Sequence, residues 1–142
     1  MSGTYQAVDA IFAKYDDKDV DLRAIGEPDK SVILCVSAQG IIDKGGFITF
    51  FEDDIEENVD YQWFVEAYRK VGMETLADNF AEILALFPEG APQQDLGERR
   101  SYLARFFDDE SPEYMNILGA LENVFFDNND QVYQAAEVFC KG

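Results

Sequence analysis

METLADNFAEILALF, residues 73–87, is the stretch of sequence that decides the fold class. Its larger apolar residues recur at i, i+4, i+7, i+8 and i+11, the spacing that places side chains on one face of an α-helix. These residues are Leu76, Phe80, Ile83, Leu84 and Phe87. Pro88 follows at once and ends the pattern, because proline cannot continue a helix. The stretch therefore predicts an amphipathic helix with one buried face.

Several other segments of the chain show the same helical periodicity. Ser111 and Pro112 supply a capping residue and a proline at the first position of one helix, and Gly72 ends another. The predicted helices cover residues 5–15, 28–45, 61–72, 73–87, 96–107, 112–125 and 132–140. Because no repeat, low-complexity tract or linker divides the chain, we expect a single domain over residues 1–142. Its predicted fold is an irregular all-α bundle of about seven helices.

The segment around residues 32–36 has two interpretations. Its sequence, VILCV, is rich in β-branched residues, which suits a buried strand. Pro28 stands where a helix would begin and Gly45-Gly46 where it would end, which favours a helix of about four turns. The helix is the favoured prediction, and the strand is the alternative.

Charge is the strongest constraint on function. The 142 residues contain 11 Lys and Arg against 29 Asp and Glu, a formal net charge of −18. The 12 Phe and 7 Tyr supply enough apolar bulk for a folded core, which argues against disorder. So large a negative charge repels phosphates and anionic lipids, so we expect no direct binding of nucleic acid or membrane. The expected partner is a basic protein.

The composition also removes much of enzyme chemistry. Histidine is absent, which excludes histidine-based triads, general bases and metal sites. Cys35 and Cys140 have neither CxxC spacing nor a framework pattern, and they are expected to be reduced structural thiols. No basic leader and no run of about 18 apolar residues is present. A cytoplasmic location is therefore the expectation.

Three groupings of carboxylates are candidate binding residues. The first follows a run of phenylalanines and contains six acids in nine residues: Glu52, Asp53, Asp54, Glu56, Glu57 and Asp60. The second lies on the helix predicted over residues 73–87 and contains Glu74, Asp78 and Glu82. The third begins at Asp108, Asp109 and Glu110 and continues through Glu113, Glu122, Asp127 and Asp130 to Glu137.

The second grouping has a geometry that its helix defines. Spacing of i, i+4 and i+8 stacks Glu74, Asp78 and Glu82 about 6 Å apart along one face, opposite the apolar stripe. Like charges at i, i+4 are destabilising by a few tenths of a kcal/mol per pair, so stability alone would favour a lysine among them. The face is either an ordinary solvated surface or a charged ridge for a cationic partner.

Metal sites and catalytic sites find little support. Asp17, Asp19 and Asp21 alternate as the first ligands of a calcium loop do, but Leu22 replaces its turn glycine and Pro28 its bidentate glutamate. Carboxylates on a solvent-exposed, highly charged helix surface lack the raised pKa that an acid catalyst needs. We expect no metal, no cofactor and no enzymatic activity.

Two further expectations concern the packing of Trp63 and the pairing of the arginines in the second half of the chain. By helical angle Trp63 lies away from its helix's apolar stripe, so it either packs against a second helix or serves as an apolar anchor for a partner. Arg99, Arg100 and Arg105 are expected to pair within the chain and so relieve charge repulsion.

One pattern in the middle of the chain resembles a known family. It spans about residues 41–88 and consists of Gly45-Gly46-Phe47, Phe50-Phe51-Glu52, Ala67, Val71-Gly72-Met73, Ala77 and Leu84-Ala85-Leu86-Phe87-Pro88. The pattern is similar to that of the DNA mimic protein 19-like family, acidic bacterial domains of unknown function in most members. The two glycines permit a left-handed backbone and close approach, and the three phenylalanines of the pattern are expected to fill the bundle.

The resemblance implies a mostly helical fold, homodimerisation and no catalysis. It also implies a DNA mimic, in which carboxylates arranged like duplex phosphates occupy the DNA-binding surface of a basic protein such as a transcriptional regulator. One alternative is an immunity-type inhibitor of a basic toxin, for example a nuclease. Another is an acidic scaffold with an apolar interaction site at Trp63, whose complexes would be insensitive to salt.

Overall fold

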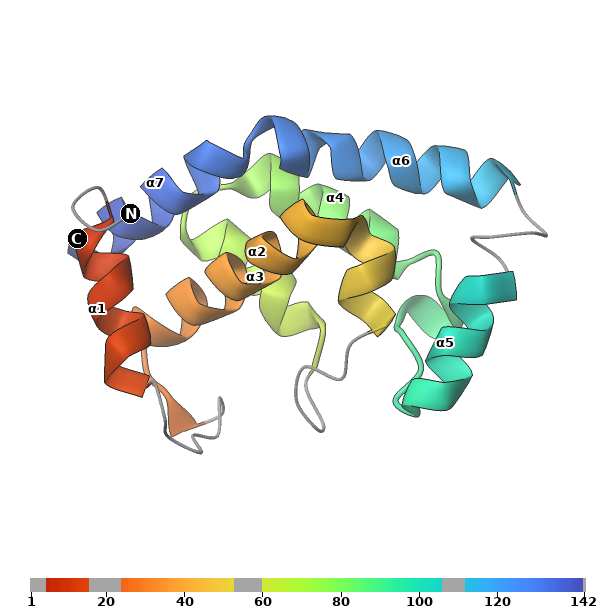
Figure 1. Ribbon diagram of the computed structural model, residues 1–142, viewed down its shortest axis with the longest axis horizontal. Helices are drawn as coiled ribbons and strands as arrows, with labels where there is room; N and C mark the ends of the chain where they lie inside the picture. The colour runs from red at the N-terminus through yellow and green to blue at the C-terminus, as the bar shows by residue number, and fades with distance from the viewer. Residues whose placement is uncertain (1–4, 16–23, 53–59, 106–111, 142) are drawn as a thin grey trace.

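The computed structural model describes residues 5–15, 24–52, 60–105 and 112–141. Regular structure throughout these residues is helical and includes no strand, which confirms the predicted all-α fold. Seven α-helices follow one another in this single-domain bundle (Figure 1). They are α1 (Gln6–Tyr15), α2 (Asp29–Glu52), α3 (Gln62–Lys70), α4 (Glu74–Leu84), α5 (Leu96–Ala104), α6 (Pro112–Asp127) and α7 (Asn129–Lys141). A 3-10 turn, η2 (Pro88–Gly90), lies between α4 and α5.

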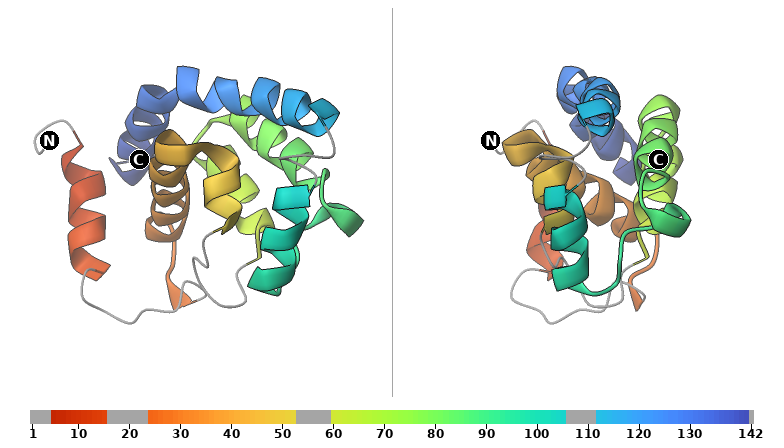
Figure 2. Two further views of the ribbon diagram at one scale, coloured as in Figure 1. Left: turned by 45° about the vertical axis from the view of Figure 1, so that its right-hand side comes forward. Right: turned by 90° about the vertical axis from the view of Figure 1, so that its right-hand side faces the viewer.

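Helix α2 runs through the middle of the bundle and contacts α1, α3, α5, α6 and α7. Helices α6 and α7 follow each other along one edge of the molecule, and α1 and α5 lie at opposite ends (Figures 1 and 2). Helices α3 and α4 pack against each other across a short turn at Gly72, which has a φ of 94°. This arrangement leaves one face of α4 at the surface.

Aromatic rings fill the centre of the bundle. Phe80 of α4 lies at their middle, with ring centroids 5.0 Å from Phe47 and 5.9 Å from Phe64. Tyr68 and Phe125 complete the cluster from α3 and α6. All five side chains are fully buried. Edge-to-face and offset-stacked rings add to the stabilisation that comes from their buried apolar area.

Helix α2 contains a break that the sequence predicts only in part. Gly46 has φ 77° and ψ −173°, in the left-handed region that glycine was expected to supply. The helix was expected to end there, but it resumes at Phe47 and continues to Glu52. The strand alternative for residues 32–36 is wrong, because these residues lie inside α2. The change of direction at Gly46 places Phe47, with Phe50 and Phe51, in the core.

A carboxylate from α6 supports this break. The backbone N–H of Phe47 donates to Glu122 Oε1 at 2.8 Å, which satisfies a donor that has no partner in the first turn of a helix. A Cβ on Gly46 would lie 2.7 Å from the same oxygen. Glu122 was grouped with the surface acids, and that placement is wrong because the side chain faces inward to α2. Burial raises the pKa of Glu122, although the hydrogen bond from Phe47 opposes the shift.

Glu137 of α7 has an equivalent role for α1. Its side chain is buried, and its two carboxylate oxygens accept hydrogen bonds from the N–H groups of Ala7 at 2.9 Å and Val8 at 3.0 Å. A carboxylate at a helix N-terminus also interacts favourably with the helix dipole. The sequence prediction that Glu137 belongs to a surface grouping is therefore wrong as well.

Two of the arginines bind the other end of α2. Arg99, which is buried, donates from Nε to the carbonyl of Phe51 at 2.6 Å, and Arg100 Nε donates to the carbonyl of Glu52 at 3.0 Å. They occupy carbonyls that a helix C-terminus leaves without partners. Both arginines are thus bonded within the chain, but to backbone carbonyls, and the expected relief of charge repulsion by Arg99, Arg100 and Arg105 stays a prediction.

Helix α2 is, by length and composition, the one helix among the described residues that could cross a membrane. In the bundle its apolar residues, Val32, Leu34 and Ile42 among them, are buried by the surrounding helices. The core helix of a folded domain satisfies the same criterion, and packing in the bundle accounts for the apolar composition of α2.

Gly46→Ala should destabilise the protein, because a φ of 77° with a ψ of −173° is adopted almost only by glycine and costs another residue about 1–3 kcal/mol, and the new Cβ would also displace the Glu122 carboxylate. Gly40→Ala is the matched control within α2, since a Cβ there meets no atom within 4 Å. The control should be neutral or stabilising by about 0.5–1 kcal/mol. Urea unfolding measures both variants, and equal stability of the two would contradict this account of the break.

Glu122→Gln should remove one pH-dependent contribution to stability. A raised pKa means that the folded state holds this proton more tightly than the unfolded state, so the contribution is complete below pH 4.5 and is lost as the pH rises through the folded pKa. Glutamine can still accept from Phe47 but does not titrate. Urea unfolding between pH 5 and 8, above the isoelectric point near 4.1, should therefore show wild type losing stability relative to Glu122→Gln as pH rises. Glu66→Gln, an exposed control on α3, should run parallel to wild type.

Candidate acidic interface on helix α4

The three acids of the second grouping lie together on the exposed face of α4. Glu74, Asp78 and Glu82 are all exposed, and we call these three residues the α4 ridge. The opposite face of the helix, with Leu76 and Phe80, is buried. The predicted two-sided helix is confirmed, and its burial holds the ridge on a fixed support.

The spacing of the ridge can be compared with that of nucleic acid phosphates. Carboxylates at i, i+4 and i+8 cover about 12 Å along a helix axis. One strand of a DNA duplex carries a negative charge about every 3.4 Å along the duplex axis, which gives three or four phosphates over about 12 Å. The ridge carries one charge about every 6 Å, so its line charge is a little more than half that of a single DNA strand.

One arginine of the same chain contacts the ridge. Arg69, in the last turn of α3, places a guanidinium nitrogen 3.0 Å from Asp78 Oδ1. Both side chains are largely exposed, so the attraction is screened by water and is weak. The middle carboxylate of the ridge thus binds a guanidinium already, and a partner's arginine would replace the one from α3.

Two hydrogen bonds, one at the start of α4 and one in its middle, fix the position of the helix. At its start, the N–H of Met73 donates to the carbonyl of Tyr68 at 2.9 Å and closes the turn after α3. In its middle, Asn79 Nδ2 donates to the carbonyl of Leu121 on α6 at 3.2 Å. These contacts hold the ridge relative to α3 and α6.

The structure describes only part of the other predicted groupings. Glu52 is exposed at the end of α2. The remaining predicted partner-binding acids lie outside the described residues: Asp53, Asp54, Glu56, Glu57, Asp108, Asp109 and Glu110. The α4 ridge is therefore the predicted acidic site whose side chains are placed together, and the roles of the other acids stay predictions.

Trp63 is half-buried against the core rather than fully exposed. Lys30, in the first turn of α2, places its Nζ 4.2 Å from the centre of the tryptophan ring, within the range of a cation–π interaction. A partner using Trp63 as an anchor would have to move this lysine. Its role as an apolar anchor stays a prediction.

The described residues offer little other chemistry. Cys35 is a free thiol, and burial raises its pKa to about 12, so it is not a thiolate at neutral pH. Within the same part of the chain, no three Cys, Asp or Glu side chains come close enough together to hold a metal ion.

Sequence reasoning found the ridge but missed Arg69. The three acids lie on one helix, so their periodicity alone predicted that they share a face. Arg69 reaches Asp78 from a different helix. The available signal was the short turn at Gly72, which places the end of α3 beside the start of α4.

A family model described as DMP19-like protein matches residues 23–141. The chain belongs to this family. The match is wider than the resemblance seen over residues 41–88, and it covers α2 to α7 while α1 precedes it. No curated protein and no solved structure gave a match.

Proposed function

We propose that this DMP19-like protein is a non-enzymatic acidic binding protein whose α4 ridge occupies the DNA-binding surface of a basic partner, such as a transcriptional regulator. The observation that carries the proposal is the row of three exposed carboxylates, one about every 6 Å, on a helix whose other face is buried in the core. Membership in the DMP19-like family supports it.

The charge of the whole chain favours the same kind of partner. A net charge of −18 attracts a basic surface over a distance of about one Debye length, which is about 8 Å at physiological ionic strength. Electrostatic steering of this kind raises the association rate and makes it sensitive to salt. Binding to a basic DNA-binding surface should therefore weaken as salt increases.

The proposal is tested by competition with DNA. Basic proteins are captured on the immobilised chain from its native lysate at low salt, eluted in salt steps and identified. Each captured DNA-binding protein is then bound to fluorescent DNA, and the chain is added while anisotropy is recorded. Release of the DNA supports the proposal. Capture of a nuclease toxin, with loss of its activity, would favour the immunity-type alternative, and binding that is insensitive to salt would contradict both.

Replacing the ridge by Glu74→Gln, Asp78→Asn and Glu82→Gln should weaken binding of the captured partner about tenfold, by the usual strength of exposed charge pairs. The fold should survive, since these side chains are exposed. The control triple Glu27→Gln, Glu66→Gln and Glu98→Gln removes the same number of charges from exposed positions outside the three groupings, and like the ridge triple it breaks one exposed ion pair, here Glu27 with Lys70. Equal loss of affinity in both triples would show that net charge, and not the ridge, binds the partner.

Arg69→Gln should strengthen binding of the same partner by about two- to threefold, because it removes the guanidinium that competes for Asp78. Lys44→Gln is the control, an exposed cation on α2 that makes the same change in net charge. Titration of each variant by fluorescence anisotropy measures the difference. Equal gains in the two variants would mean that the Arg69 contact has no specific effect.

A further inference from the structure

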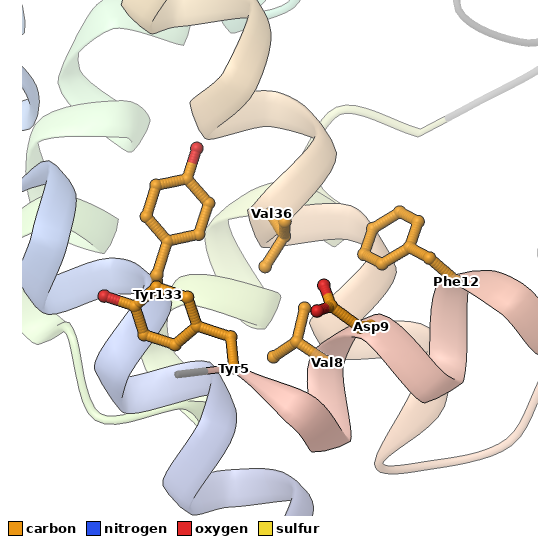
Figure 3. A pocket seen from close by; sticks show the side chains of 6 residues that line it. All are labelled: Tyr5, Val8, Asp9, Phe12, Val36 and Tyr133. Atoms are coloured by element: carbon orange, nitrogen blue, oxygen red, sulfur yellow. The ribbon is translucent and has the colours of Figure 1, made fainter. Parts of the chain in front are cut away.

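A pocket of about 370 Å³ lies between α1, α2 and α7, away from the α4 ridge. Figure 3 shows the side chains that line it, which come from all three helices. They are Tyr5, Val8, Asp9, Phe12, Val36 and Tyr133. Its volume is within the range of small-molecule sites.

Three aromatic rings form much of the lining. Tyr5 and Tyr133 lie side by side, with ring centroids 5.8 Å apart and an angle of 40° between the ring planes. Phe12 lies on the other side of the group (Figure 3). All three residues are half-buried, so each keeps accessible surface. The Tyr133 hydroxyl points away from Asp9 and approaches Asp43 at 3.5 Å, so it is the Tyr133 ring that faces the pocket.

Among the described residues that line the pocket, Asp9 is the one charged group. Its carboxylate lies between the tyrosine rings and Phe12 (Figure 3). Among the described residues, no side chain or backbone group forms a hydrogen bond or an ion pair with it. The pocket therefore combines three aromatic rings with a negative charge that the described residues do not neutralise.

Helix α1 forms one side of the pocket, and its N-terminus is anchored. Val8, Asp9 and Phe12 share one face of α1, and Tyr5 directly precedes the helix on the same side, at i, i+3, i+4 and i+7 spacing. The first turn of α1 is fixed by the two hydrogen bonds to the buried Glu137. The lining from α1 thus has a defined position against α2 and α7.

We propose that this pocket binds an alkylated ammonium head group, such as the trimethylammonium group of choline. Aromatic faces attract cations through the ring quadrupole, and a carboxylate adds direct charge attraction. A trimethylammonium group has no N–H donors, so the rings and the two valines can surround it without leaving a polar group unsatisfied.

Other classes of ligand fit less well. An anion would meet Asp9 and a chain of net charge −18. A calcium ion needs six to eight oxygen ligands, whereas the lining supplies a single carboxylate. A primary ammonium keeps three N–H donors that need acceptors, and the apolar lining offers few. The charge and the ring faces together favour an alkylated cation.

This site is independent of the proposed function. It contains no residue of α4, and four of its six lining residues, Tyr5 and three from α1, lie before the region matched by the DMP19-like family. Failure of the ridge to bind a basic protein would not affect the proposal for the pocket. Failure of the pocket to bind a cation would likewise not affect the proposal for the ridge.

Titration with choline and with its neutral isostere 3,3-dimethylbutan-1-ol tests the proposal. The two probes have nearly the same shape and differ in charge. In two-dimensional NMR spectra, choline should shift the signals of residues in the pocket at lower concentration than the isostere, by about tenfold or more. Equal binding of the two probes, or no binding of choline, would overturn the proposal.

Three variants assign the binding to the pocket. Asp9→Asn removes the charge and should weaken choline binding by about three- to tenfold, and Phe12→Leu, which keeps apolar volume but removes a ring, by about two- to fivefold. Asp78→Asn on α4 is the control with the same change in net charge and should leave choline binding unchanged. Thermal unfolding by circular dichroism verifies that each variant is folded. Equal effects of Asp9→Asn and Asp78→Asn would overturn the proposal.

A peptide carrying trimethyllysine distinguishes the two sources of the head group. Tighter binding of the peptide than of choline would assign the site to a methylated protein side chain, and tighter binding of choline would assign it to a free small molecule. Both results support an alkylated ammonium site, provided that the unmethylated lysine peptide binds at least tenfold more weakly. Equal binding of the methylated and unmethylated peptides would overturn it.

Discussion

The left-handed break at Gly46 and the carboxylate of Glu122 that supports it are the constraint on which the rest of the bundle depends. Without the break, α2 would continue straight and could not direct Phe47 toward Phe80 and Phe125. Those rings join α2, α4 and α6, and through them the buried face of α4 is held in place. The exposed acids of α4 have fixed positions because their helix is anchored from behind.

Most of the helices could be predicted from the sequence, because helical periodicity and the residues that end helices are local properties. The sequence could not predict whether α2 ends or changes direction at Gly46, because a glycine that ends a helix and one that redirects it have the same local sequence signal. What separates the two cases is Glu122, which is distant in sequence. Glu122 and Glu137 were misplaced for the same reason: an acid that caps another helix has no local signature that distinguishes it from a solvated one.

The candidate sites also differ in whether they lie on one helix, which the sequence can predict, or between several helices, which it cannot. The α4 ridge was predictable because Glu74 and its two companions share one helix, whereas the contact of Arg69 with Asp78 requires two. The aromatic pocket requires three helices, and no single segment of sequence indicates it. The fold also uses some of its few cations internally: Arg99 and Arg100 bind carbonyls at the end of α2.

The attachment of α1 has a consequence for local opening. This helix packs against α2 and α7 outside the aromatic cluster, and the N–H groups of Ala7 and Val8 are bonded to one glutamate side chain. Its amide protons should therefore exchange with solvent through a partial unfolding event of lower free energy than the one that exposes Phe80. The domain would then contain two cooperative units, a stable aromatic body and a terminal helix that detaches first.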